Sequence, residues 1–422
     1  MLIRADRLID GTGAAPLPEA TLILEGDRIA AVCRGEPPPG LVPPDAEILD
    51  YRGCTVLPGL IDAHVHLNLP GDGTTLEEAM READGVLVAT SAFQAAKALA
   101  AGITTVRDVG GLRSTVIEVR RALELGHGDG ARILACGQPI TITGGHTWYF
   151  GGEADGEEGL RRKVREMARL GADFIKVMAT GGGTLNTLSW MPSFRKEELV
   201  ALADEAHRQN RKITAHCLCA AAIEDVVDAG FDQIEHAFFL ANAKGEQKFV
   251  PSVAEKVARA GVPVTSTLAV SGFMLEALRA KTTLSPAEQA TLDRWRRTHD
   301  ATLAHFRKMH EAGVHFVAGT DAGWRFTRID GLPLELELMQ EGGVSATEAV
   351  AAATGGAAKV LGVDDRLGTL SAGLAADAIV VAGNPLDDLG RLRDVKLVVQ
   401  KGKIALGERP RGRGETKPKA LS

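Results

Sequence analysis

The sequence lacks the features that mark membrane-spanning and secreted proteins. No apolar run is long enough to cross a bilayer, and the N-terminal stretch MLIRADRLIDGTG contains neither an uninterrupted apolar segment nor a small-residue cleavage site. Cysteine is scarce: the five cysteines are an odd number scattered over 422 residues, which argues against a disulfide framework. We therefore expect a cytoplasmic protein whose cysteines are reduced.

The sequence also lacks an excess of charge of one sign. Its 55 acidic and 48 basic residues are mixed along the chain, so neither a nucleic-acid footprint nor a membrane-binding face is indicated. The glycine clusters TGGH (143–146) and ATGGGT (179–184) do not have the spacing of phosphate-binding loops. A small-molecule substrate is therefore the expected partner, and we expect these glycines to allow close approach of the backbone.

Between residues 57 and 363, short apolar strands alternate with stretches of helical periodicity. The predicted strands are CTVLPGLIDAHVHL, TTVRDV, ARILACG, DFIKVMAT, KITAHC, QIEHAF, PVTSTLAV and HFVAGTDAG. Helices are predicted over 157–172, 196–210 and 254–262. Eight such units predict an α/β protein with a (β/α)8 or TIM barrel, whose reactive groups lie at the C-terminal ends of the strands.

The two ends of the chain have a different texture. Residues 1–56 and 364–407 both alternate β-like runs with turn residues, without a long helical pattern. We predict that these separated segments pair into one small β-sandwich. Residues 408–422 have no core-forming content and are expected to be a solvated basic tail.

The residues that could carry chemistry lie where the predicted strands end. His64 and His66, in PGLIDAHVH, are two positions apart, so their side chains point to the same side of a strand. On their own they could equally be strand-end histidines bound to backbone carbonyls. Other strands contribute further nitrogen and oxygen groups, namely Lys176, His216, His236 and Asp321. Together these side chains predict a site for Zn²⁺, Mn²⁺ or a similar ion.

Five motifs occur in the order found in one known superfamily: PGLIDAHVH, FIKVMATGG, ITAHC, IEHAFF and AGTDAG. With them, the sequence resembles the amidohydrolase superfamily of metal-dependent hydrolases over nearly its whole length. Within it, the chain is similar to the branch of imidazolonepropionase-related proteins and Xaa-Pro or Xaa-Arg/Lys dipeptidases. Many members of that branch have a His-Gly pair where this chain has Asp330 and Gly331, which predicts a different substrate pocket.

The resemblance implies a centre of two divalent metal ions, zinc first, with manganese, cobalt and iron as alternatives. His64, His66 and Asp321 would hold the more buried ion, and His216 and His236 the more exposed one. Lys176 would bridge them as a carbamate formed with CO₂. The alternative for Lys176 is a salt bridge and a site with one metal. A hydroxide between the two ions would be the nucleophile.

The resemblance also implies two catalytic side chains. Asp321 would accept the proton of the attacking hydroxide and deliver it to the leaving nitrogen. His146, in TITGGHTWYF, would donate a hydrogen bond to the substrate carbonyl. Its alternative role is to cap the following helix.

For the substrate, we expect an amide C–N bond of a dipeptide or N-acyl amino acid. Arg325 or Arg328 would hold its carboxylate and Tyr149 would contact it, although loop arginines are usually solvated and the ring could simply pack under its loop. Aryl amides, phenylureas and (thio)carbamates are the alternative class, which aromatic residues of the loops would suit: Trp148, Tyr149, Trp190, Trp324 and Phe326. A catalytically silent scaffold would be expected to lack metal ligands. As in many relatives, a homo-oligomer is expected.

Overall fold

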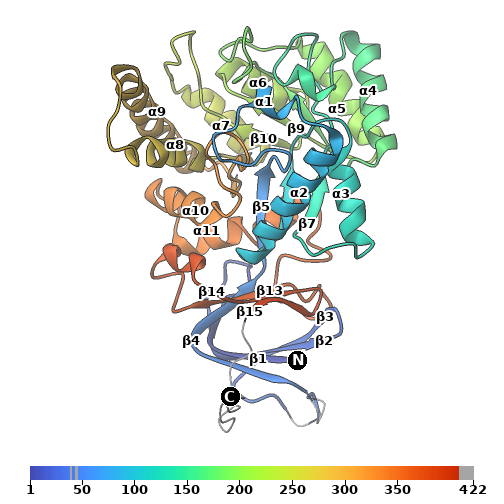
Figure 1. Ribbon diagram of the computed structural model, residues 1–422, viewed down its shortest axis with the longest axis vertical. Helices are drawn as coiled ribbons and strands as arrows, with labels where there is room; N and C mark the ends of the chain where they lie inside the picture. The colour runs from blue at the N-terminus through green and yellow to red at the C-terminus, as the bar shows by residue number, and fades with distance from the viewer. Residues whose placement is uncertain (39, 43–45, 408–422) are drawn as a thin grey trace, which may run out of the picture.

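The structure is a computed structural model that describes residues 1–38, 40–42 and 46–407. Figure 1 shows strands from both ends of the chain in the lower half of the molecule, and the helices gathered around a second group of strands in the upper half. The predicted tail, 408–422, lies outside the described residues. Within them, no helix is long and apolar enough to cross a membrane, and all five cysteines are free.

The lower half is one mixed sheet of seven strands. In chain order these strands are β1 (Leu2–Leu8), β2 (Leu17–Glu25), β3 (Arg28–Arg34), β4 (Ile48–Pro58), β13 (Ala378–Ala382), β14 (Val395–Gln400) and β15 (Lys403–Gly407). Their order in the sheet is β15-β14-β13-β4-β1-β2-β3. The two ends of the chain therefore pair, as expected, in the strands of one continuous sheet. The link is β4, an 11-residue strand that pairs with β1 through residues 48–51, 55 and 56 on one edge and with β13 through residues 54–58 on the other.

The upper half contains eight parallel strands in two sheets, ordered β5-β6-β7 and β12-β11-β10-β9-β8. They are β5 (Leu60–Val65), β6 (Ile103–Asp108), β7 (Arg132–Ala135), β8 (Phe174–Met178), β9 (Lys212–Cys217), β10 (Gln233–His236), β11 (Val264–Thr265) and β12 (Phe316–Val317). Seven of them lie within a predicted strand and β6 begins one residue before one, at Ile103, and the predicted α/β class is confirmed. The first prediction was too long, because the chain leaves β4 at Pro58 and begins β5 at Leu60. Gly59 fits this junction because a Cβ atom would lie 2.1 Å from the Thr104 side chain.

Helices cover the parallel strands and extend beyond their ends. They are α1 (Leu76–Ala79), α2 (Asp84–Ala100), α3 (Thr115–Glu124), α4 (Gly156–Leu170), α5 (Lys196–Arg208), α6 (Ala220–Asp228), α7 (Pro251–Ala260), α8 (Ala269–Arg279), α9 (Pro286–Glu311), α10 (Leu332–Glu341), α11 (Ala346–Ala352) and α12 (Gly355–Leu361). The three predicted helices correspond to α4, α5 and α7. The start of helix α9 was not predicted, although it has a complete signal: Ser285 caps it, Pro286 is its first residue and Glu288 closes the capping box.

Candidate metal centre and active site

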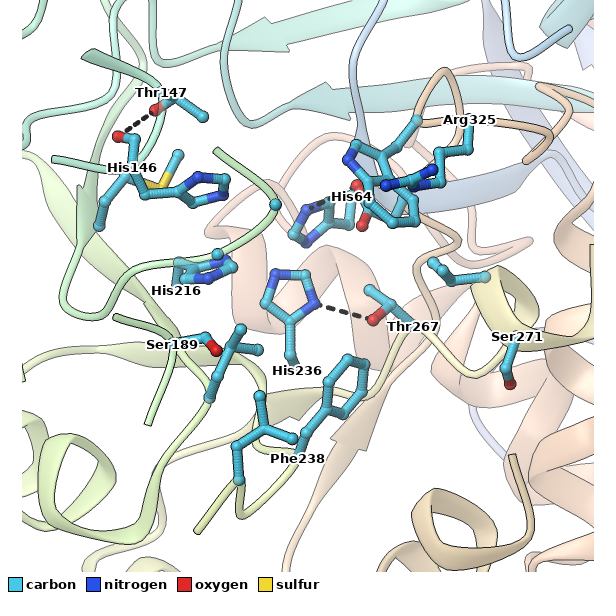
Figure 2. Close-up of a pocket in the computed structure, with 18 of the residues that line it drawn as sticks. His64, His146, Thr147, Ser189, His216, His236, Phe238, Thr267, Ser271 and Arg325 are labelled. Atoms are coloured by element: carbon cyan, nitrogen blue, oxygen red, sulfur yellow. Dashed lines mark hydrogen bonds and ion pairs between the residues drawn. The ribbon is translucent and has the colours of Figure 1, made fainter. Parts of the chain in front are cut away.

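The six predicted metal ligands converge at one end of the parallel strands. They come from β5 and the residues just after it, from β8, β9 and β10, and from the loop after β12. All six line one cavity of about 280 Å³, and Figure 2 shows the imidazoles of His64, His216 and His236 pointing toward its centre. Lys176 is 1% exposed at the bottom of this cavity. Six side chains from distant positions of the sequence are thus assembled into one polar site.

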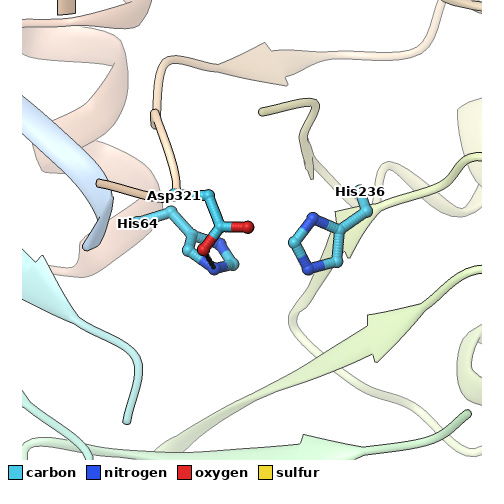
Figure 3. A group of neighbouring side chains, drawn as sticks. All are labelled: His64, His236 and Asp321. Carbon is cyan, nitrogen blue, oxygen red and sulfur yellow. Dashed lines mark ion pairs between the residues drawn. The ribbon is translucent and has the colours of Figure 1, made fainter. Parts of the chain in front are cut away.

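One group of ligand atoms is compact enough to share an ion. The ligand atoms of His64, His236 and Asp321 all lie within 4.8 Å of one another (Figure 3). His66 belongs to the same corner, because its Nε2 is 3.2 Å from Asp321 Oδ1, while Nε2 of His64 is 3.5 Å from the same oxygen. These contacts bring two of the three predicted ligands of the more buried ion, His64 and His66, to the carboxylate of the third, Asp321.

The predicted ligands of the second ion adjoin the first group. The ring centroid of His216 is 4.6 Å from that of His236, which in turn is 4.9 Å from that of His64. The ring of His146 is 4.7 Å from His216 on the other side. The four imidazoles therefore form a continuous row that crosses the cavity from the Asp321 corner to the loop that carries His146.

Hydrogen bonds to the outer ring nitrogens orient these imidazoles. His66 donates from Nδ1 to the carbonyl of Gly110 at 2.8 Å, and Nδ1 of His236 lies 2.9 Å from the hydroxyl of Thr267. That hydroxyl already donates to the carbonyl of Ser266, so it accepts from His236. In both residues the second nitrogen, Nε2, is left with its lone pair for the centre. Imidazole nitrogens held in this way, together with a carboxylate, fit a divalent ion such as zinc or manganese.

His64 is oriented by a buried ionic network that the sequence did not reveal. Its Nδ1 donates to Oε2 of Glu235 at 2.8 Å, and Oε1 of Glu235 accepts from Arg107 Nη2 at 2.6 Å. Arg107 also donates to the carbonyl of Ala63 and to the side chain of Gln233. Burial alone would raise the pKa of Glu235, but Arg107, Lys176 and His64 hold it well below the usual range. The ionised carboxylate of Glu235 thus orients the ring of His64 through Nδ1.

The charges of the site favour neutral rings at His64 and His146 and an ionised carboxylate at Asp321. At His66, burial alone would lower the pKa, but the hydrogen bond and the charge of Asp321 raise it above the ordinary value. Burial, and secondly the charge of Lys176, lower the pKa of His64 to about 4 and that of His146 to about 3. Burial opposes ionisation of Asp321, but His64 and His66 outweigh it and keep its pKa below the ordinary value. Burial lowers the pKa of Lys176. A buried amine with this shift has a larger neutral fraction, which is the form that reacts with CO₂.

The strand ends that carry the site are strained. His236 and Asp321 have φ angles of 73° and 61°, and Thr147 and Thr267, beside or bonded to site histidines, have 56° and 53°. Non-glycine residues in this region cost about 1–3 kcal/mol each and persist only where the surroundings hold them. Such clustering of strain is typical of functional sites.

Comparison with known proteins identifies the family. The model of the amidohydrolase family matches residues 55–405, which is most of the chain. The chain belongs to the amidohydrolase family. It is 29% identical over 436 aligned residues to the ochratoxinase of Aspergillus niger, covering 94% of this chain and 84% of that protein. It is also 24% identical to the imidazolonepropionase of Symbiobacterium thermophilum, covering 90% and 87% of the two chains.

Solved structures agree with this assignment. The crystal structure of a Xaa-Pro dipeptidase with methionine bound in its active site superposes on this amidohydrolase with a TM-score of 0.81 and 27% identity. The superposition covers 96% of this chain and 98% of the other. The predicted resemblance to the branch with imidazolonepropionase and Xaa-Pro dipeptidase is confirmed.

The residues predicted to bind substrate in this amidohydrolase are not all at the cavity. His146 and Arg325 line it, whereas Tyr149 and Arg328 are not among the described residues that do. Arg328 instead contacts Glu276 and Asp330, each at 3.2 Å. The hydroxyl of Tyr149 lies 3.3 Å from Thr184 Oγ1. Of the aromatic residues expected in the loops, Trp324 lines the cavity. The others are not among the described residues that line it, namely Trp148, Trp190 and Phe326.

One wall of the cavity was missed altogether. Helix α9 contributes Trp295, Thr298 and Thr302, whose spacing places them on one face of the helix. The helical spacing of these three residues is present in the sequence. It could not be assigned to the site without knowing that α9 forms a wall of the cavity.

Proposed function

We propose that the chain is a metal-dependent hydrolase that cleaves an amide C–N bond of a dipeptide or an N-acyl amino acid. The observation that carries this proposal is the convergence of the six predicted ligands, which include Asp321, around one cavity that His146 also lines. The similarity to a Xaa-Pro dipeptidase supports the substrate class. A silent scaffold would not need this set of ligands.

We also infer that the eight parallel strands form one closed (β/α)8 barrel. Backbone hydrogen bonds cross both gaps between the two sheets: Asp173 N–H donates to Ala135 O at 2.8 Å, and Ala63 N–H donates to Ala318 O at 3.0 Å. The first contact links β7 to β8, and the second links β12 to β5. A closed barrel would explain why ligands from strands far apart in the sequence meet at one rim.

Two divalent ions, zinc first, would be held by His64, His66 and Asp321 on one side and His216 and His236 on the other. Lys176 would bridge them as a carbamate, for which its burial and lowered pKa prepare the amine. When bound, such ions supply an activated water and polarise the substrate carbonyl. These nitrogen and oxygen donors suit zinc, and manganese, cobalt or iron would also bind to them.

The side chains of the protein supply the proton transfers and the orientation. Asp321 is ionised and 13% exposed at its side chain, so it can accept a proton at Oδ1 or Oδ2 and return it to the leaving nitrogen. His146 is a neutral ring on the opposite side of the cavity. A neutral N–H there would donate to the carbonyl oxygen as negative charge develops on it.

Arg325 is the residue best placed to bind a substrate carboxylate. It lines the cavity and stacks over the ring of Trp324, with its guanidinium carbon 4.6 Å from the ring centroid. In the described part of the chain, no carboxylate lies within ion-pair distance of it, in contrast to Arg328. A guanidinium without an acidic partner at the mouth of a cavity can form a bidentate contact with a carboxylate.

The alternative class is aryl amides, phenylureas or (thio)carbamates. Aromatic side chains that line the cavity favour it, because they would stack on a ring; they are Phe150, Phe238, Trp295 and Trp324. The two classes differ in the need for a carboxylate. Matched pairs of substrates, an N-acyl amino acid and its carboxamide, should be assayed with Zn²⁺ or Mn²⁺ and bicarbonate. The proposal expects the free acid to be hydrolysed at least about tenfold more efficiently, since a charged hydrogen bond contributes about 1.5–3 kcal/mol. Equal rates would favour the alternative.

A further inference from the structure

The hydroxyl of Thr184 joins two loops at the rim of the cavity. Thr184 lies in the loop after β8, and its partners lie in the loop after β7. Its Oγ1 atom is 2.8 Å from His146 Nδ1, 3.0 Å from the backbone nitrogen of Thr147 and 3.3 Å from the hydroxyl of Tyr149. Thr184 is buried, so these three contacts define its surroundings.

The three contacts can be assigned because a hydroxyl has one proton and two lone pairs. The backbone N–H of Thr147 can only donate, which occupies one lone pair of Thr184. Tyr149 keeps its phenolic proton at neutral pH, since burial raises its pKa to about 12. The two hydroxyls lie 3.3 Å apart and either can donate; with Tyr149 as the donor, the second lone pair of Thr184 is occupied.

The proton of Thr184 then has one remaining acceptor, His146 Nδ1, which is also its shortest contact. An imidazole that accepts at Nδ1 carries its single proton at Nε2. Nε2 of His146 lies beside Gly182, which lines the cavity. Because His146 and Gly182 both line the cavity, this edge of the ring lies at the cavity wall, within reach of a substrate carbonyl.

We propose that Thr184, supported by Tyr149, is a positioning residue that fixes His146 in the tautomer with its proton on Nε2, so that His146 donates to the reacting carbonyl oxygen. This inference rests on the proposed function for the role of His146 in the reaction, but the tautomer itself does not depend on it. Tyr149 acts on the reaction through Thr184 and His146, and not by touching substrate.

The test combines spectroscopy with kinetics on the metal-reconstituted enzyme. In protein labelled with ¹⁵N-histidine, His146→Gln assigns the His146 signals, and the shifts of Nδ1 and Nε2 report which nitrogen carries the proton. We expect a protonated Nε2 and an unprotonated Nδ1 in the wild type. A protonated Nδ1 overturns the proposal, whether or not the protein hydrolyses any amide. A correct tautomer in a protein without hydrolase activity leaves this inference standing and removes the proposed function.

Three variants provide the kinetic arm. Thr184→Val keeps the shape and removes the hydroxyl, and should lower kcat about 10–100-fold with KM changed less than about twofold, because a complete oxyanion donor is worth about 10²–10³. Thr184→Ser restores the hydroxyl and should recover most of the rate. Tyr149→Phe should lower kcat by a smaller factor. Wild-type turnover in Thr184→Val, or equal losses in Thr184→Val and Thr184→Ser, would overturn the proposal. If Thr184→Val does not fold, Thr184→Ser, Tyr149→Phe and the ¹⁵N shifts decide it.

Discussion

The Cα atom of Gly182 lies so close to the ring of His146 that a Cβ atom added there would stand 2.4 Å from His146 Nε2. The next residue, Gly183, is different: a Cβ atom would meet only the ring of Trp324, at 3.4 Å. The glycine cluster ATGGGT was predicted to permit close approach of the backbone, and at Gly182 the structure shows what approaches it. The space beside this glycine is occupied by a predicted catalytic side chain.

We predict that Gly182→Ala lowers kcat about 100-fold while the protein remains folded. The new methyl group would displace the His146 ring, and a misplacement of about 1 Å can cost a factor of about 10² in rate. Gly183→Ala is the matched control, because its methyl group makes an ordinary contact and should change kcat less than threefold. Steady-state kinetics with circular dichroism of both variants checks this. Equal effects of the two substitutions would contradict it.

Asp321→Asn should lower kcat by a factor of about 10²–10⁴, the usual contribution of a general acid–base group. The amide keeps the size of the side chain but cannot accept the proton. Metal content must be measured in the same sample, because Asp321 is also a predicted ligand. Near wild-type turnover in the metal-loaded variant would exclude the proton-transfer role.

Arg325→Met should raise KM about 10–100-fold for substrates with a free carboxylate and leave KM for their carboxamides nearly unchanged. Arg328→Met is the control, because Arg328 already contacts Glu276 and Asp330 at the surface. The pair is checked by parallel Michaelis–Menten measurements on both substrates. A larger effect of Arg328→Met would place the carboxylate elsewhere.

Glu235→Gln should weaken metal binding about 10–100-fold, because a partner that orients a ligating histidine typically contributes that much. The amide cannot accept from both His64 and Arg107. Glu335→Gln is the control, since Glu335 is equally buried but accepts from Ser266 and from the backbone of Ala269. Competition with a chromophoric chelator measures the affinity. Equal affinities of the two variants would show that Glu235 has no such role.

The stability of the protein should fall from pH 5 to pH 8 through Glu335. Burial raises the pKa of this carboxyl to about 8, above its ordinary value of 4.5. The folded state therefore binds a proton that the unfolded state has lost, so the contribution is complete below about pH 4.5 and disappears as the pH rises through about 8. It amounts to at most about 5 kcal/mol. Urea unfolding at pH 5.5 and 8.5 checks this, because the two proteins share their other buried titrating groups, such as Asp62 and His64. The wild type should lose more unfolding free energy between the two pH values than Glu335→Gln, and equal changes would contradict the prediction.

Much of the fold could be predicted because its signal is local. The common direction of the H-x-H pair at the end of β5 follows from the two-residue period of strands. The single ligands of β9 and β10 could be predicted because they lie at the ends of predicted strands. The same local rules predicted α4 and α5 from their apolar periodicity. The limits of β4 and β5 could not be predicted, because the apolar run continues through Gly59 while the chain moves from one sheet to another.

The supporting contacts of the site could not be predicted because they join distant residues. His64 and Glu235 are 171 positions apart, and His146 and Thr184 are 38 positions apart, on different loops. Neither Glu235 nor Thr184 belongs to a periodic pattern that marks it. For the same reason Arg325 and Arg328 were equivalent in the sequence, and only their surroundings separate them.

The histidines, Lys176 and Asp321 would together form a metal centre that hydrolyses a C–N bond. The most direct test is the metal content of the protein, reconstituted with Zn²⁺ or Mn²⁺ in bicarbonate, measured together with amide hydrolysis before and after chelation. We predict close to two ions per chain, loss of hydrolysis when they are removed, and recovery when they are returned. Fewer than one ion per chain, or hydrolysis that survives chelation, would contradict the claim.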